Sequence, residues 1–211
     1  MDFLSRGTGG PSPGALKWLL DHGADPQVAA REYGSPLSML ICTYARNAKG
    51  RSACLEAFAE AGFDLPDTPA MALHRGRMDM LHAHLDRDPS LLEHRFQETE
   101  IFPAELGIKP GEGLHVTPVF GATLLHLAIE YDDIDAARWL IERGADVNAK
   151  AALDADGFGG HTPLYHTVVT LAAPDDSKAR LLLERGADPN ARATIRKQLR
   201  DMGDPEKEKM H

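Results

Sequence analysis

A short phrase recurs along this chain and constrains its fold more than any other feature. It ends in Gly-Ala-Asp, and it occurs as WLLDHGADP at 18–26, WLIERGADV at 139–147 and LLLERGADP at 181–189. A weaker copy, FAEAGFDLP, occupies 58–66. Self-similarity at intervals of tens of residues indicates stacked repeats, in which one copy buries its apolar face only against its neighbours.

The stretch TLLHLAIEYDDIDAARWLIERGADVNAK, 123–150, shows what one copy contains. Apolar side chains recur at helical spacing before and after Asp132-Asp133, which predicts two short helices joined by a tight turn. The two aspartates suit the start of the second helix, where carboxylates cap free amides. Asp132 also tolerates the left-handed conformation, and Gly144 is placed to end the second helix in that conformation.

The copies also begin alike, with GSPLSML at 34–40, DTPAMAL at 67–73, ATLLHLA at 122–128 and HTPLYHT at 161–167. Their lengths differ, and the extra residues fall in turns, near 46–52 and 173–175. Chain is added to turns at low cost, so irregular spacing is compatible with one repeated unit.

The two best copies, at 123–149 and 162–191, resemble ankyrin repeats, which open on Thr-Pro-Leu-His and close on Gly-Ala-Asp-x-Asn. This chain departs from that pattern at Leu124 for proline, Asp132 for glycine and Tyr165 for histidine. The resemblance implies an all-α solenoid of about four to five helix-turn-helix repeats. It also implies that His126 is a structural histidine that bonds to neighbouring backbone.

We therefore expect 1–211 to form a single ankyrin-repeat domain. Its expected parts are a partial repeat at 13–33, full repeats at 34–66, 67–93, 121–148 and 161–190, an insertion at 94–120 and a charged tail at 194–211. No further repeat is visible in the tail. Either the native protein continues past His211, or the tail folds back to cap the last repeat.

Two segments stand outside the repeat pattern. The segment 94–120 is rich in apolar residues, so it is expected to be ordered, either as a small satellite core or as an exposed binding surface. The segment 149–161 predicts a hairpin-like finger with a turn at Asp156-Gly157. Its D-x-D-G string lacks the remaining ligands of a calcium loop, so no metal is expected there.

Composition limits the classes of partner. A formal net charge of −9 disfavours a nucleic-acid partner, since binding to phosphates relies on clustered Lys and Arg. No run approaches the roughly 18 apolar residues of a membrane span, and the N-terminus does not read as a secretory signal. Cys42 and Cys54 are expected to be reduced thiols in a cytoplasmic protein.

The sequence favours a protein without catalytic residues, cofactor or metal, because no established catalytic motif occurs in its proper context. Glu130, Tyr131, His161 and His166 could gather on adjacent repeats, where a binding surface is the favoured interpretation. The alternative is a small-molecule or metal-dependent enzyme with 94–121 as a lid. It predicts a deep pocket lined by His115, His126 and Glu130.

The favoured function is a protein–protein interaction module, an adaptor or inhibitor that binds through its concave face and long loops. A narrower alternative is an immunity or antitoxin protein, and a third is a scaffold fragment of a longer protein. A monomer is expected, with a domain-swapped or weak dimer as the alternative. The resemblance implies partner contacts at Tyr33, Thr43, His74, Arg75, Phe102, Val119, Phe120, Glu130, Tyr131, Phe158, His161 and Thr170.

Overall fold

The computed structural model describes residues 11–25, 35–42, 47–108, 118–168 and 175–195, and helices are its main elements over these ranges. Four hairpins follow one another: α2 (Pro36–Cys42) with α3 (Ala48–Glu60), α4 (Pro69–His74) with α5 (Met78–Arg87), α7 (Leu124–Glu130) with α8 (Ile134–Glu142), and the 3-10 helix η4 (Pro163–Thr167) with α9 (Ser177–Glu184). A further helix, α1 (Pro13–Asp21), packs on α3.

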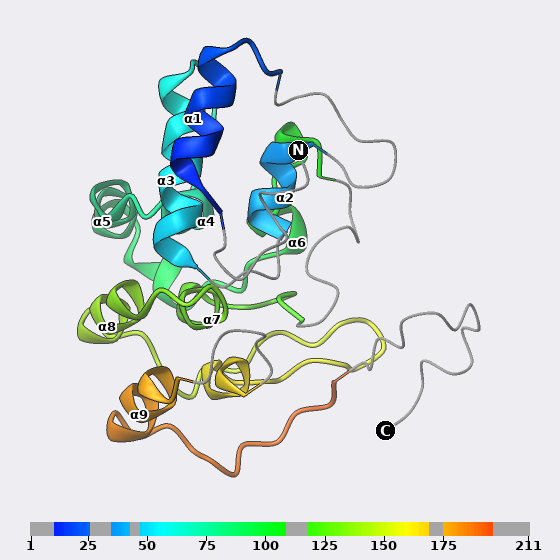
Figure 1. Cartoon of the computed structure of the whole chain (residues 1–211). Coiled ribbons are helices and arrows are strands. Elements are labelled where there is room, and N and C mark those ends of the chain that lie inside the picture. The colour runs from blue at the N-terminus through cyan, green and yellow to red at the C-terminus, as the bar shows by residue number, and fades with distance from the viewer. Residues whose placement is uncertain (1–10, 26–34, 43–46, 109–117, 169–174, 196–211) are drawn as a thin grey trace.

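The hairpins stack in chain order, from α1 at one end of the molecule to α9 at the other (Figure 1). Within this stack α4 packs against α7, α7 against η4, and α8 against α9. Contacts between neighbouring units are the defining feature of a solenoid. The predicted all-α helical-repeat solenoid is therefore confirmed. We call the first helix of each hairpin, namely α2, α4, α7 and η4, its inner helix.

Local hydrogen bonds explain where the helices begin. The hydroxyl of Thr68 accepts from the backbone N–H of Met71 at 3.2 Å, and the same type of residue, Thr123, caps α7. Asp133 caps α8 by accepting from the N–H of Ala136 at 3.0 Å. Asp132 instead takes the left-handed conformation, with φ of 63°. The two predicted roles of the Asp-Asp pair are thus divided between its members.

The recurrent Gly-Ala-Asp forms the end of the second helix in a repeat. Gly144 has φ of 102°, and Gly186 in the next repeat has φ of 88°. After this reversal the N–H of Ala145 donates back to the carbonyl of Leu140 at 2.9 Å, and Asp146 accepts from the N–H of Asn148 at 2.8 Å. The phrase recurs because glycine adopts the left-handed conformation without steric cost.

The insertion packs into the core. It contains α6 (Glu98–Ile101) and the 3-10 helix η3 (Ala104–Leu106), and it follows another 3-10 helix, η2 (Pro89–Leu92). Its apolar side chains join the continuous cluster formed by the repeats, and six of those in its described part are buried: Phe96, Ile101, Phe102, Leu106, Ile108 and Val119. The apolar content of this segment therefore reflects burial. Residues 109–117 lie outside the described residues.

The finger at 149–161 is a hairpin, as predicted. Its turn is closed by a bond from the N–H of Gly157 to the carbonyl of Asp154 at 3.0 Å. On one side, the N–H of Ala152 donates to the carbonyl of Gly121 at 3.0 Å. On the other, Gly159 and Thr194 exchange two backbone bonds, of 2.7 and 3.2 Å. The finger is thus joined by backbone bonds to the chain before α7 on one side and to the chain after α9 on the other.

Candidate functional site

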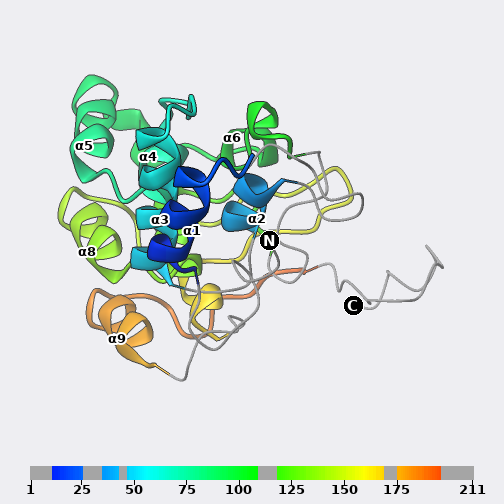
Figure 2. The ribbon, with the colours of Figure 1, turned by 45° about the horizontal axis from the view of Figure 1, so that its top comes forward.

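The insertion covers the inner helices of the first two hairpins. A ring nitrogen of His74, Nε2, is 3.1 Å from the carbonyl oxygen of Ile101, and the hydroxyl of Ser35 donates to the carbonyl of Leu106 at 3.4 Å. Helix α6 lies beside α2 both in Figure 1 and in the turned view of Figure 2. The inner helices α2 and α4 therefore contact the chain's own insertion.

A buried arginine connects the C-terminal ends of the inner helices. Arg51 on α3 donates from Nε to the carbonyl of His74 at 3.3 Å and from Nη1 to the carbonyl of Tyr131 at 3.4 Å. The guanidinium carbon lies 4.5 Å from the centre of the Tyr131 ring, and the Tyr131 hydroxyl donates to the carbonyl of Ile41 at 3.3 Å. This network satisfies carbonyls that the helices leave unpaired, and cations stabilise helix C-termini.

His126 binds two neighbouring segments of backbone. Its Nδ1 accepts from the N–H of Thr123 at 3.1 Å, so the ring proton is on Nε2, which donates to the carbonyl of His161 at 3.0 Å. Burial, followed by the charge of His166, lowers the pKa of His126 well below its usual value. The prediction of a structural histidine at this position is confirmed.

Between α7 and η4 lies a buried group of ionisable side chains. His166 donates from Nδ1 to a carboxylate oxygen of Glu130 at 2.7 Å, and both side chains are fully buried. The ring of His161 lies 5.0 Å from that of His166 and 5.5 Å from that of His126. A carboxylate that orients an imidazole is half of a general-base arrangement. Because this pair is enclosed, a substrate in solution has no access to it.

A buried lysine also joins the last two hairpins. Lys178 on α9 lies 2.7 Å from a carboxylate oxygen of Asp132 and donates to the carbonyl of Ile129 at 3.4 Å. Its charge is thus balanced by the carboxylate of the left-handed turn and by the C-terminal end of α7. These contacts fix α9 against the C-terminal end of α7.

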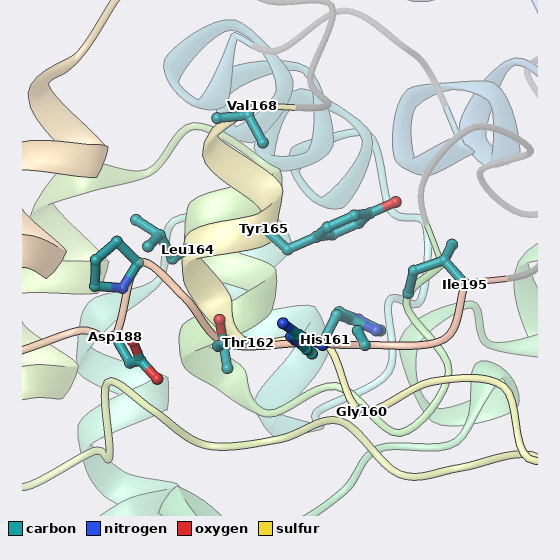
Figure 3. Close-up of a pocket in the computed structure, with 12 residues that line it drawn as sticks. Gly160, His161, Thr162, Leu164, Tyr165, Val168, Asp188 and Ile195 are labelled. Carbon is teal, nitrogen blue, oxygen red and sulfur yellow. The ribbon is translucent and has the colours of Figure 1, made fainter.

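A pocket of about 520 Å³ opens at the last repeat, between η4 and the segment 188–195 (Figure 3). Its apolar lining comes from Leu164, Val168, Pro189 and Ile195, and its polar lining includes His161, Thr162, Tyr165, Asp188 and Arg192. The rings of His161 and Tyr165 lie 5.4 Å apart. Burial raises the pKa of Tyr165 above its usual value, and the charge of Glu130 acts in the same direction.

A family model for ankyrin repeats matches residues 104–193 with three copies. Residues 104–193 are ankyrin repeats. The match begins inside the segment expected to be an insertion and ends beyond α9, so it includes the finger at 149–161 and all of the pocket lining except Ile195. No curated protein matches the chain.

Five residues predicted to be exposed at ankyrin contact positions are buried, so this part of the prediction is wrong: His74, Val119, Glu130, Tyr131 and His161. The physical reason is non-local. Tyr131 turns back toward Arg51 and Ile41 in earlier repeats, and Glu130 turns forward to His166 in the next. Phe102, predicted as a contact on the insertion, is also buried.

The other predicted contacts divide into two groups. Phe120 is exposed, and Arg75 and Phe158 are partly buried. Arg75 is paired with Glu56 at 2.5 Å. Tyr33, Thr43 and Thr170 lie outside the described residues, as does His115 of the enzyme alternative. His126 and Glu130, which that alternative places in the lining of a pocket, are fully buried, and neither lines the pocket beside η4.

The ankyrin positions did not indicate several residues of the pocket. Tyr165 occupies the position of the family's structural histidine, where this sequence departs from the pattern. Val168 is an exposed apolar residue of the pocket that is not among the predicted contacts. The signal in the sequence is tyrosine in place of histidine at position 165. A tyrosine ring has no nitrogen that could accept a backbone N–H, as the ring of His126 does.

Over the described residues, no three His, Cys, Asp or Glu side chains are grouped as metal ligands. No helix in those ranges is both long enough and apolar enough to cross a bilayer. Cys42 and Cys54 form no disulfide, and burial raises the pKa of the Cys54 thiol to about 11.

Proposed function

We propose that this ankyrin array is a non-catalytic binding module, an adaptor or inhibitor that binds a protein partner at its C-terminal repeats. Ankyrin repeats typically mediate protein–protein interactions and are generally not catalytic. We define the open face as the finger at 149–161, η4, the segment 188–195 and Phe120. Three of the predicted contacts fall within this face, namely Phe120, Phe158 and His161, and of these only Phe120 and Phe158 have accessible side chains.

The observation that carries the proposal is the contrast in exposure along the inner surface. On the open face Phe120 is 37% exposed, Leu153 61% and Val168 79%. Over α2 and α4 the insertion buries its own apolar side chains instead. Exposed apolar side chains on loops that a rigid scaffold supports are characteristic of binding surfaces.

The buried ionisable side chains support a structural role. Glu130 and His166 are paired and enclosed, and His126 is bonded on both ring nitrogens. These groups hold η4 against α7, and this contact positions the open face. A rigid, preformed surface is suited to docking without a large rearrangement of the backbone.

The proposal is tested by affinity capture from a lysate of the source organism with three forms of the full chain. The first is the wild type. The second carries Phe120→Ser, Leu153→Ser and Val168→Ser on the open face. The third is a matched control, Trp18→Ser and Leu183→Ser, which removes apolar side chains that are 59% and 46% exposed on α1 and α9.

We expect a protein that the wild type and the control retain and the open-face variant loses. Circular dichroism and urea unfolding confirm that all three forms are folded. A partner that the control loses and the open-face variant keeps would place the interaction on the outer helices. Retention by all three forms, or by none, would contradict the open face as the binding surface.

A further inference from the structure

The chain after α9 reaches Thr194 in the way that the chain reaches the inner helices of the two repeats before it. Ala122, which precedes the cap of α7, and His161, which precedes the cap of η4, each accept a backbone N–H from earlier chain at 2.9 Å. Thr194 likewise exchanges two backbone bonds with Gly159, of 2.7 and 3.2 Å. In both preceding repeats an inner helix follows directly, so the chain beyond Thr194 starts from a comparable arrangement.

The pocket beside η4 is the next position in the stack. His166 turns toward α7, where it bonds to Glu130, whereas Leu164, Tyr165 and Val168 line the pocket (Figure 3). Elsewhere in the array consecutive inner helices pack on one another, α4 on α7 and α7 on η4. The pocket therefore lies where the inner helix of a further unit would pack on η4.

The sequence that follows has the pattern of a short amphipathic helix. Residues 196–211 lie outside the described residues. In the sequence, the apolar side chains recur at intervals of four and three residues and so share one helical face: Ile195, Leu199 and Met202. The opposite face is charged: Arg196, Lys197, Arg200 and Asp201. A helix of this kind is stable when its apolar face is buried against another element.

Start and stop signals bound this helix. Thr194 is a suitable residue to cap its first turn, as Thr123 does for α7. Gly203 and Pro205 are typical of the residues just beyond a helix C-terminus. A helix over 195–202 would be similar in length to α7.

We infer that residues 195–202 form a capping helix that packs on η4 in this pocket, with Leu199 and Met202 against its apolar lining. The chain's own segment is favoured over a helix from another molecule because Ile195 already lines the pocket, so closing the contact costs little chain entropy. The charged face of the helix would then point outward, and a polar outer face is what the end of a repeat array requires for solubility.

This inference goes beyond the proposed function, because it concerns a contact within the chain. Val168 lines the pocket and is also one of the exposed apolar residues of the open face. A partner would therefore meet Phe120 and Leu153 directly, and it would reach Val168 only by displacing the capping helix.

Hydrogen exchange of the full chain tests the contact. In a helix that begins at Ile195, the amides of 199–202 are the first to bond to a carbonyl four residues earlier. We expect them to exchange about tenfold to a hundredfold more slowly than in an unstructured chain, because burial of one or two apolar side chains holds the helix in place. NMR contacts between the methyl groups of Leu199 or Met202 and those of Val168 would locate the helix in the pocket.

Three variants identify the two surfaces. Leu199→Ser with Met202→Ser removes the apolar face and should abolish the slow exchange. Lys197→Ser with Arg200→Ser is the matched control on the charged face and should leave the exchange slow. Val168→Ser, at a position that is 79% exposed, changes the pocket without disturbing the core and should make the exchange faster. The amides of α7 report in every form whether the array is folded.

Three results would overturn the inference. The first is fast exchange of 199–202 in the wild type. The second is slow exchange that Val168→Ser does not alter, which would place the helix elsewhere. The third is slow exchange that appears only as the protein concentration rises, which would assign the pocket to a second copy of the chain. None of these results depends on capture of a partner, so the proposed function is tested separately.

Discussion

The inner helices α2 and α4 differ from α7 and η4 in what lies against them. The first pair contacts the insertion, through bonds from Ser35 and His74 to its backbone carbonyls. The last inner helix, η4, instead borders a pocket of about 520 Å³ with exposed apolar side chains nearby. The same repeat architecture therefore produces a covered surface at one end and an open one at the other.

The cause of this difference is where the extra chain falls. Two long segments interrupt the repeats, and they behave differently. The segment 94–108 carries many large apolar side chains and folds back onto the helices before it. The finger at 149–161 is built mainly of small and polar residues, with Leu153 and Phe158 as its large apolar ones, and it pairs with the segments beside it. An insertion thus decides which repeats keep an accessible inner surface.

The largest expected effect separates the covered end from the open one. Phe102→Ala should lower the free energy of unfolding by about 4 kcal/mol, because it leaves a cavity under the insertion. The matched change Phe120→Ala, on the open face, should cost about 1 kcal/mol or less. Urea unfolding of the two variants measures both values. Similar losses for the two would mean that the insertion does not form a packed cover.

The Arg51 network gives the next largest effect. Arg51→Met should lower the free energy of unfolding by about 3 kcal/mol, because the carbonyls of His74 and Tyr131 then lose buried partners. Arg143→Met is the control, since Arg143 pairs with Asp86 at the surface and stacks on Trp139. Surface pairs of this kind contribute at most about 1 kcal/mol. Equal losses in urea unfolding would show that Arg51 does not connect the repeats.

Substitution of Gly121 tests the contact between the finger at 149–161 and the chain before α7. Gly121 has φ of 66°, and a Cβ placed there would lie 2.3 Å from the Cβ of Ala152. Gly121→Ala should therefore lower the free energy of unfolding by about 2–3 kcal/mol, from backbone strain and from displacement of the finger at 149–161. Gly157→Ala has a similar φ of 83° but open space around it, so only the conformational cost of about 1 kcal/mol is expected. Thermal unfolding that ranks the two variants in the reverse order would contradict the close contact between the finger at 149–161 and the chain before α7.

The sequence predicted those features that depend on neighbouring residues. The cap at Asp133, the left-handed Asp132 and Gly144, the bond from Thr123 to His126 and the turn at Gly157 all follow from interactions within a few residues. The helical solenoid follows in turn, because such hairpins can bury their apolar faces only by stacking.

The sequence did not predict contacts between distant segments. Tyr131 was expected at the surface from its place in the repeat, but its partners Arg51 and Ile41 lie 80 and 90 residues earlier. The apolar content of 94–108 indicated burial without indicating which helices it would cover. The pocket has the same origin, since one wall is η4 and the other is chain that follows α9.

The smallest effect concerns His161 and depends on pH. Its pKa in the folded protein is about 3, whereas an unfolded histidine has about 6.5. As pH falls from 7 to 5, the unfolded state takes up a proton that the folded state does not, so the protein loses about 2 kcal/mol of stability through this ring. His161→Phe should remove that share of the pH dependence while changing stability at pH 7 by about 1 kcal/mol, because the hydrogen bond lost with the ring is the single one to the backbone of Pro118.

Urea unfolding of the wild type and His161→Phe at pH 7 and pH 5 measures this difference. The other buried histidines, His74 and His126, have lowered pKa values in both forms, so their contributions cancel in the comparison. Parallel losses of stability in the two forms would mean that His161 is protonated in the folded protein. This measurement therefore tests whether His161, at the open end of the array, is buried as a neutral ring.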